Sequence, residues 1–155
     1  MTAESLSDPE LGYTVASIPE GLDGTQTKVL QDYIAYDKAT WRLWFTNEGV
    51  DEMHSYATGD ALERITANAE KRSGRHANPP VRIAVSEVTV EPSGVAKVRA
   101  CLDQSEVTET DDQGKDVTKK ENQARFPVTI KLVNGSGGSW LANEEDTGEA
   151  NSCSL

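Results

Sequence analysis

The sequence predicts an α+β domain, in which helices come first and an antiparallel sheet follows. Up to about residue 72, apolar residues recur at spacings of three and four, which is typical of one buried helix face. Beyond Pro80 the apolar period changes to two, which is typical of half-buried strands. Asn78-Pro79-Pro80 separates the two parts, because proline cannot continue a helix. The 155 residues are enough for one compact domain with a single core.

The first part of the chain predicts an arm followed by three helices. Residues 1–23 carry Ser, Asp, Pro and Gly without periodicity, so we expect a flexible N-terminal arm there and the folded domain over 24–155. The alternative is that Tyr13, Val15 and Ile18 place part of this arm on the domain. The helices are expected at about 25–46, 50–56 and 61–72. Thr25 is the expected cap of the first helix, and Ser73-Gly74 closes the third.

The second part predicts four strands, at about 81–90, 96–103, 118–133 and 139–143. The apolar positions of the first strand change parity near Ser86-Glu87, which indicates a β-bulge. The polar residues 109–114 are expected to form a hairpin tip. Pro127 has no N–H to donate, so it favours an edge or bulged position for the third strand.

Charge and composition argue against several classes of function. The chain has 26 acidic and 15 basic residues and a net charge of −11, so binding to nucleic acid or anionic lipid through general charge is not expected. No apolar run approaches the roughly 18 residues of a transmembrane helix. The acidic tip at 109–114 does not fit a calcium loop, because Lys120 stands where a bidentate Glu is required. We therefore expect no metal, no cofactor, no nucleic acid and no transmembrane segment.

Asp37 is the most interesting titratable residue. It falls between Ile34 and Trp41 on the apolar face of the first long helix, close to Tyr33. A carboxylate that faces a hydrophobic cavity has a raised pKa and can act as a general acid or base. The alternative is that Asp37 lies at the edge of this face or pairs with a basic group elsewhere.

Aromatic residues are concentrated on the same helix. They are Tyr33, Tyr36, Trp41, Trp44 and Phe45. They predict either a part of the core or the lining of a pocket between helix and sheet, and both alternatives stay open. His54 and His76 are the side chains whose ordinary pKa lies near neutrality. For both we expect a position at the surface or the edge of the core rather than a catalytic role.

The chain has two cysteines, Cys101 in the second strand and Cys153 close to the C-terminus. If they pair, the bond ties the last residues to the sheet and indicates an oxidising compartment. The alternative is a cytoplasmic protein with two free thiols. Met1-Thr2-Ala3-Glu4-Ser5 has neither the basic nor the apolar region of a signal peptide. An extracytoplasmic protein, secreted or lipid-anchored, would therefore have its export signal outside this chain.

Four short motifs carry a resemblance to a known family. They are Tyr33-Ile34-Ala35-Tyr36, Tyr56-Ala57-Thr58-Gly59-Asp60-Ala61, Val98-Arg99-Ala100-Cys101-Leu102-Asp103-Gln104-Ser105, and a last strand with Trp140 followed by Cys153. Over about 25–155 the chain resembles the NTF2-like, or cystatin-like, cone fold. More narrowly, it resembles the extracytoplasmic domains of small actinobacterial lipoproteins of unknown function. The resemblance implies that the four-stranded sheet is curved and that Cys101 and Cys153 form a disulfide, with Asp103 completing a Cys-x-Asp motif.

Two functions agree with this resemblance, and we favour the first. It is a non-enzymatic, extracytoplasmic binding or accessory domain of the cell envelope. Its partner is a protein, a cell-wall component or a small apolar ligand, bound at the cone opening or the outer sheet face. The ligand-binding residues are then Tyr33, Tyr36, Asp37, Trp41 and Trp44. The alternative is a small-molecule isomerase, dehydratase or cyclase, with Asp37 and Tyr33 or His54 as catalytic residues inside the cone.

The two hypotheses require different structures. The enzyme requires Asp37 to point into a cavity and to have a hydrogen-bonding partner. The binding domain predicts a filled or purely apolar cone and an exposed apolar patch. A homodimer formed through the sheet face is compatible with both.

Overall fold

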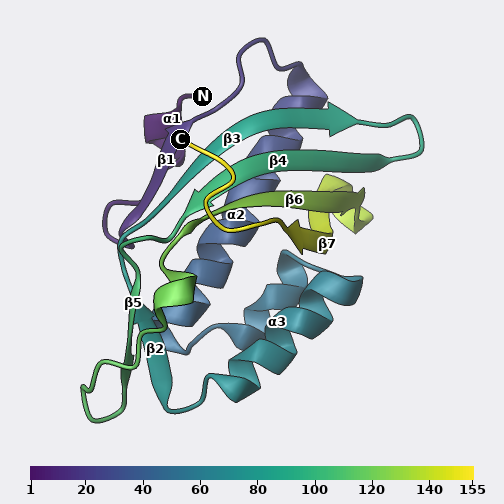
Figure 1. Cartoon of the computed structure of the whole chain (residues 1–155). Coiled ribbons are helices and arrows are strands. Elements are labelled where there is room, and N and C mark those ends of the chain that lie inside the picture. The colour runs from purple at the N-terminus through teal and green to yellow at the C-terminus, as the bar shows by residue number, and fades with distance from the viewer.

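One long helix lies against the inner face of a curved sheet, and a second helix lies below the sheet (Figure 1). The computed structural model describes all 155 residues. The helices are α1 (Ala3–Leu6), α2 (Gly24–Thr46) and α3 (Gly59–Lys71), and the short 3-10 helices are η1 (Val50–Ser55), η2 (Lys120–Asn122) and η3 (Ser136–Gly138). The strands are β1 (Tyr13–Ser17), β2 (Arg75–Asn78), β3 (Val81–Val90), β4 (Val95–Asp103), β5 (Thr108–Asp111), β6 (Arg125–Asn134) and β7 (Trp140–Thr147).

The main sheet has five strands, not the expected four, in the order β1-β3-β4-β6-β7. The additional strand is β1, which runs parallel to β3 and comes from the segment predicted as a flexible arm. Tyr13 and Val15 lie opposite Val81 and Ile83, and all four are buried. For β1 the arm is therefore corrected to a structural strand. Its five residues are too few for an apolar alternation to stand out from the polar sequence around them.

Most of the other predicted elements lie where expected. The register between β3 and β4 shifts between Val85 and Glu87, which confirms the predicted bulge. The cap of α2 is Asp23 rather than Thr25, because the Asp23 carboxylate accepts the Gln26 N–H at 2.8 Å. Pro127 lies in the inner strand β6 and pairs in regular register with Cys101 of β4, so the expected edge or bulged position is wrong. It is tolerated there because it lies just beyond the residues of β6 that pair with β7.

Strands β2 and β5 form a separate two-stranded ribbon that the sequence did not predict. Asn78 pairs with Thr108 at one end and Arg75 with Asp111 at the other. Each strand has four residues, most of them polar, so no apolar period of two is present. The ribbon replaces much of the expected hairpin tip and brings Glu109 alongside the helices.

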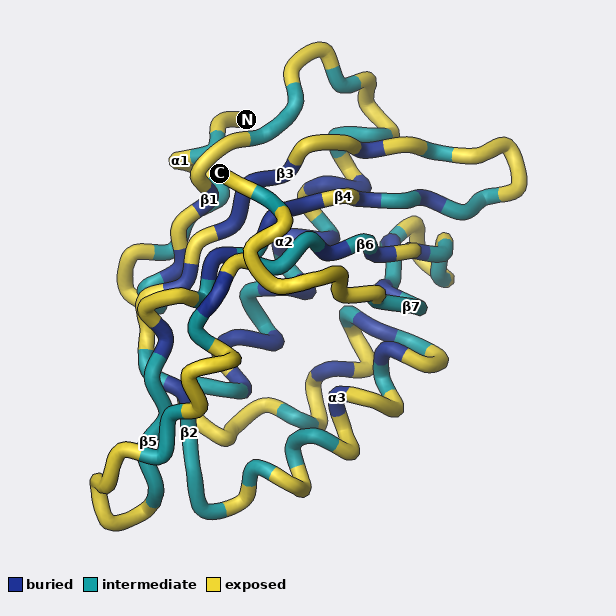
Figure 2. The backbone as a smooth tube through the Cα atoms, in the orientation of Figure 1, coloured by how far each residue is buried: buried dark blue, intermediate teal, exposed yellow.

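The helix α2 and the main sheet share one hydrophobic core (Figure 2). Its largest fully buried side chains include Leu30, Tyr33, Ile34, Ile83, Ile130 and Leu132. Each such side chain stabilises the fold by about 1.5–3 kcal/mol. Trp41 is buried with them, whereas Trp44 is only partly buried. None of the helices combines the length and the apolar character needed to cross a bilayer.

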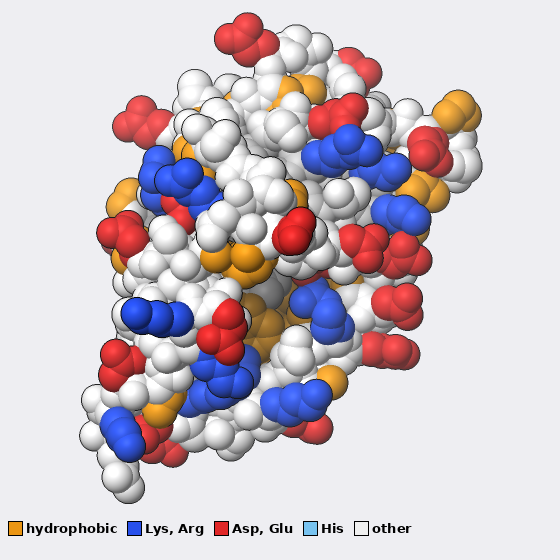
Figure 3. Space-filling model, in the orientation of Figure 1, with side chains coloured by type: hydrophobic (Ala, Val, Ile, Leu, Met, Phe, Trp, Pro, Cys, Tyr) orange, Lys and Arg blue, Asp and Glu red, His pale blue; other side chains and the backbone are white.

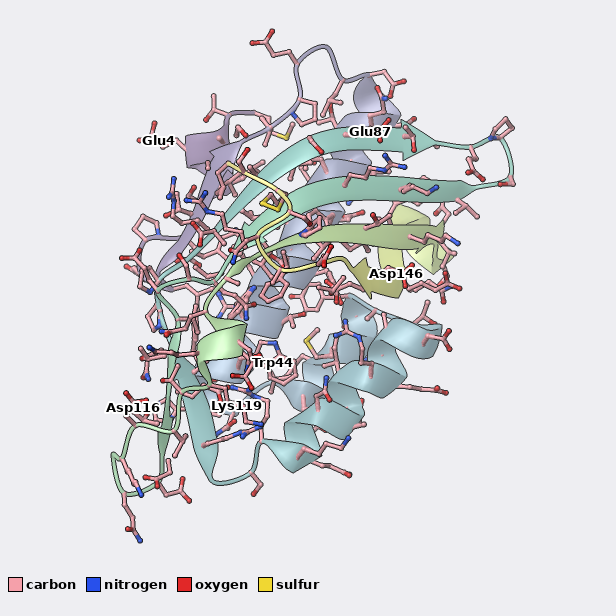
Figure 4. All side chains as sticks on the ribbon, in the orientation of Figure 1. Glu4, Trp44, Glu87, Asp116, Lys119 and Asp146 are labelled. Atoms are coloured by element: carbon pink, nitrogen blue, oxygen red, sulfur yellow. A yellow bond between two sulfur atoms is a disulfide. The ribbon has the colours of Figure 1, made fainter.

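The C-terminal tail is fastened to the outer face of the sheet. The disulfide between Cys101 and Cys153 that the resemblance implied is present, with Cα atoms 5.8 Å apart, and Figure 4 draws it as a yellow bond. The Asn151 N–H donates to the Arg125 carbonyl at 2.6 Å, and the Arg125 N–H donates to Asn151 Oδ1 at 3.1 Å. The tail thus covers the outward side of β4 next to Asp103.

Candidate functional site: a cavity inside the cone

A cavity of about 450 Å³ lies between α2, α3 and the inner face of the sheet. Figure 3 looks at its mouth, a hollow with hydrophobic side chains inside and charged side chains around the rim. Helix α2 contributes Asp37, Thr40, Trp41 and Trp44, and the sheet contributes Leu102, Phe126 and Val128. Segments after β4 and before β6 complete the rim. The cone is therefore open, and its lining is both aromatic and polar.

Asp37 lies in the wall of this cavity and is only 5% exposed. It follows Tyr33 and precedes Trp41 by one helical turn, so the three share one face of α2. The Tyr13 hydroxyl donates a hydrogen bond of 2.6 Å to Asp37 Oδ2. Burial raises the pKa of Asp37 from 3.8 to about 7; the Tyr13 hydrogen bond lowers this pKa, and the nearby Glu145 carboxylate raises it. Asp37 is therefore partly protonated at neutral pH, which suits it to give or take a proton.

A second polar group involves Tyr36, Arg64 and Glu145. Arg64 from α3 donates to the Glu145 carboxylate of β7, and its Nη2 lies 3.4 Å from the Tyr36 hydroxyl. The Tyr36 hydroxyl donates to Glu145 Oε2 at 3.4 Å. Burial raises the pKa of Tyr36, so its hydroxyl stays protonated. Glu145 thus has a cationic partner, whereas Asp37 has only a neutral hydroxyl.

A third group lies on the rim, at the C-terminal end of α3. Arg72 Nη1 donates to Glu109 Oε1 at 2.5 Å, and the Arg72 guanidinium carbon lies 5.0 Å from the centre of the Trp44 ring. Arg75 Nε lies 3.9 Å from the other oxygen of Glu109. Arg72 Nε, Arg72 Nη2 and Arg75 Nε are buried and have no hydrogen-bond partner. One carboxylate therefore faces two guanidinium groups.

The structure brings some of the predicted site residues together and separates others. Asp37, Trp41 and Trp44 line the cavity. Tyr33 and Tyr36 do not line it; they are buried behind the wall, where Tyr36 contacts the second polar group. His54 is exposed on η1 and lines a separate depression with residues of α3. It lies outside the cone, because η1 turns away after α2 ends.

The sequence did not point to Tyr13, Arg64, Arg72 or Glu145. Tyr13 lies in a segment without periodicity, and the two arginines resemble ordinary surface charges of a helix. Glu145 stands in an acidic run and faces the cavity because the register between β6 and β7 shifts after Ala142. The one available signal was that the inward-facing positions change from even to odd numbers between Ala142 and Glu145. This change extends over too few residues to be recognised without the partner strand.

No known protein family and no curated protein matches this sequence. Solved structures match its fold. The intermembrane space region of the chloroplast protein ARC6 superposes with a TM-score of 0.58 at 16% identity, over 83% of this chain and 98% of that one. A ketosteroid isomerase-like protein from Erwinia carotovora atroseptica gives 0.57 at 16% identity, over 81% and 96%. The fold is NTF2-like. Aln2 from a Streptomyces species, at 0.50 and 15% identity over 82% and 91%, agrees with this.

The NTF2-like cone confirms the predicted α+β class and its curved sheet. No group of three or more His, Cys, Asp or Glu side chains is arranged to hold a metal ion. The outer face of the sheet is polar and carries ion pairs between Arg99 and Glu87 and between Lys131 and Glu144. Among large hydrophobic side chains, those exposed are Met1 and Leu155. The filled or purely apolar cone and the exposed apolar patch that the binding hypothesis predicted are thus not found, whereas Asp37 lies in a cavity wall and has a hydrogen-bonding partner, as the enzyme hypothesis required.

Proposed function

We propose that this chain binds a small molecule inside the NTF2-like cone, in contact with Asp37, Trp41 and Trp44. The observation that carries the proposal is the open cavity with a buried carboxylate in its wall. Its volume of about 450 Å³ falls in the range of about 300–1,000 Å³ that is usual for small-molecule sites. Aromatic side chains supply contact area there, and the polar groups supply orientation.

The residues that line the cavity also restrict the polarity of the ligand. A purely apolar compound would leave the charged groups of the rim and Asp37 without new partners, at a cost in desolvation. A compound with an apolar body and polar ends matches Trp41, Phe126 and the surrounding polar groups. We therefore propose an amphipathic small molecule rather than the small apolar ligand expected from the sequence.

A fragment screen by ligand-observed NMR tests this proposal. The wild type is compared with Asn68→Trp, which places a large side chain in the cavity from the partly exposed face of α3. Fragments are expected to bind the wild type and to lose binding in the variant. Hits that bind both proteins equally, or a complete absence of hits, contradict a small-molecule site in the cone.

Proton transfer is a second candidate function, favoured by the pKa of about 7 at Asp37. In this mechanism Asp37 Oδ1 takes a proton from a carbon next to a carbonyl group, and the electron pair of the C–H bond moves to the carbonyl oxygen as an enolate. Asp37 then returns the proton to the same or a neighbouring carbon. Tyr13 keeps the carboxylate in place by its hydrogen bond to Oδ2.

Deuterium exchange measures this reaction without knowledge of the substrate. Small cyclic ketones are incubated in D₂O with the wild type and with Asp37→Asn, and exchange at the carbon next to the carbonyl is followed by NMR. Exchange above the buffer rate in the wild type alone supports proton transfer. Equal exchange in both proteins would contradict proton transfer by Asp37.

We further propose that the protein works in an oxidising, extracytoplasmic compartment. The support is the disulfide between Cys101 and Cys153, since such bonds are rare in the reducing cytoplasm. The lipoprotein resemblance agrees with this location. Titration of the thiols in protein isolated from its own host tests it, and two free thiols would contradict it.

A further inference from the structure

Arg72, on the rim of the cavity, has N–H groups from which no acceptor of the chain takes a hydrogen bond. Arg72 is only 16% exposed, and its one ionic partner is Glu109, which also faces Arg75. Two N–H groups of Arg72 are buried without a partner, and so is one of Arg75, which does not line the cavity. A buried charged donor that lacks an acceptor costs free energy, so protein interiors rarely leave one in this state. An acceptor from outside the chain would remove this cost.

Lys119 adds a further cation to the same part of the rim. It is exposed, forms no ion pair, and lines the cavity together with Arg72. Figure 4 places its label beside that of Trp44, between η2 and the end of α3. Elsewhere the chain has a large excess of acidic residues, with a net charge of −11. The cavity lining, by contrast, holds as many basic as acidic side chains, and Lys119 is its one cation without an acidic partner.

The distance between Arg72 and Asp37 determines how long a ligand must be to reach both residues. Trp44, which the Arg72 guanidinium covers, lies two helical turns from Asp37. At about 1.5 Å per residue this is about 10 Å along α2. Trp41 and Phe126 line the cavity as well. An anion at Arg72 is thus kept away from the Asp37 carboxylate, and it shares the Arg72 guanidinium group with Glu109.

We propose that the ligand of this cavity is an organic anion, with an aromatic or alicyclic body, whose carboxylate or sulfonate group binds Arg72 and Lys119. This inference rests on the proposed small-molecule site and adds its ligand class. The guanidinium group supplies directed N–H donors, stacked on Trp44, and Lys119 supplies a second charge. The body of the ligand lies between the aromatic side chains and extends toward Asp37.

Two fluorescent probes with the same aromatic skeleton test the ligand class. Anilinonaphthalene sulfonate carries one sulfonate group, and N-phenylnaphthylamine lacks it. Their affinities are measured for the wild type, Arg72→Gln, Lys119→Gln and Arg99→Gln. The last variant removes the same charge from the outer sheet face, where Arg99 is exposed. Asn68→Trp reports whether a probe binds in the cavity.

We expect the wild type to bind the sulfonate probe at least about tenfold more tightly than the neutral probe. Arg72→Gln and Lys119→Gln should each weaken the sulfonate probe, the former by about tenfold, and leave the neutral probe unchanged. Arg99→Gln should change neither affinity. If Arg72→Gln does not fold, the effect of Lys119→Gln at an exposed position and the comparison of the two probes still test the preference for an anion.

The outcomes separate this inference from the proposed function. Equal affinities for the two probes, both lost in Asn68→Trp, would leave a small-molecule site but overturn its preference for anions. An equal effect of Arg72→Gln and Arg99→Gln would also overturn it. Probe binding that Asn68→Trp does not change would instead contradict the small-molecule site itself.

Discussion

Replacement of Asp37 by Asn should make the protein more stable at neutral and alkaline pH. The wild-type carboxylate is buried, its hydrogen bond comes from the neutral Tyr13 hydroxyl, and no cation pairs with it. Its ionised form is therefore poorly solvated in the folded state. Asn has nearly the same shape, still accepts the Tyr13 hydrogen bond through its carbonyl oxygen, and cannot ionise.

The magnitude follows from the pKa of Asp37, which burial raises from 3.8 to about 7. Because the folded state holds this proton more tightly than the unfolded state, the contribution of Asp37 to stability is fully present below pH 4. It is lost as the pH rises through 7, at about 1.4 kcal/mol per pH unit. Between pH 4 and pH 8, the wild type should thus lose roughly 4 kcal/mol relative to Asp37→Asn.

Other titratable groups surround Asp37 and are shared by both proteins. They are Tyr13 on β1, Tyr33 and Tyr36 on α2, and Glu145 on β7 with its partner Arg64 on α3. Burial raises the pKa of all three tyrosines, so they stay neutral over this range. Their effects cancel in the difference between wild type and variant. The difference therefore reports the titration of Asp37.

Urea unfolding at intervals of one pH unit from 4 to 8 measures this difference, with the slope m checked at each pH. We expect the free energy of unfolding of the wild type to fall relative to that of the variant as the pH rises. A difference that stays constant over the whole range would refute it, since Asp37 would then titrate alike in the folded and unfolded chain. A difference that grows in favour of the wild type would refute it as well.

Three further predictions concern the elements around the site. Replacing Cys101 and Cys153 by Ser should destabilise the fold by about 4 kcal/mol on the loop-entropy model, because the bond closes a separation of 52 residues; denaturant unfolding of both forms checks this, and equal midpoints would contradict it. Tyr13→Phe should raise the pKa of Asp37 further, since it removes a hydrogen bond that favours the carboxylate; carboxyl NMR titration measures the shift, and a lower pKa would be the wrong sign. Gly59→Ala should cost at least about 1 kcal/mol, because φ is +53° and a Cβ would lie 2.3 Å from a side-chain oxygen of β7; an unchanged melting temperature would contradict it.

Local patterns explain what could be predicted of the fold. The apolar spacing of α2 and the alternation of β3 and β4 are properties of neighbouring residues, so the sequence shows them directly. The bulge at Ser86 was visible for the same reason, as a change of parity within one strand. Strand β1 was missed because it is short and lies in a polar segment, and the ribbon of β2 and β5 because its short strands are mostly polar; both become strands only beside their partners.

The candidate site was predicted only in part. Asp37, Trp41 and Trp44 share the face of one helix, and helical spacing is enough to group them. Tyr33 lies on that face too but is covered, since the depth of a side chain in the core depends on what packs against it. His54 was grouped with them through its neighbourhood in the chain, whereas η1 carries it outside the cone.

By itself, the sequence determined the α+β class, the order of helices and strands, and the titratable residue on the apolar face of the long helix. Only the tertiary structure shows that Asp37 lies in an open cavity and that the Tyr13 hydroxyl donates a hydrogen bond to it. It also shows that Arg72 and Lys119 lie on the rim of this cavity. Tyr13 meets Asp37 across 24 residues of chain, and Glu145 meets Tyr36 across 109. Such contacts depend on strand register and on sheet curvature, which arise only when distant segments pack together.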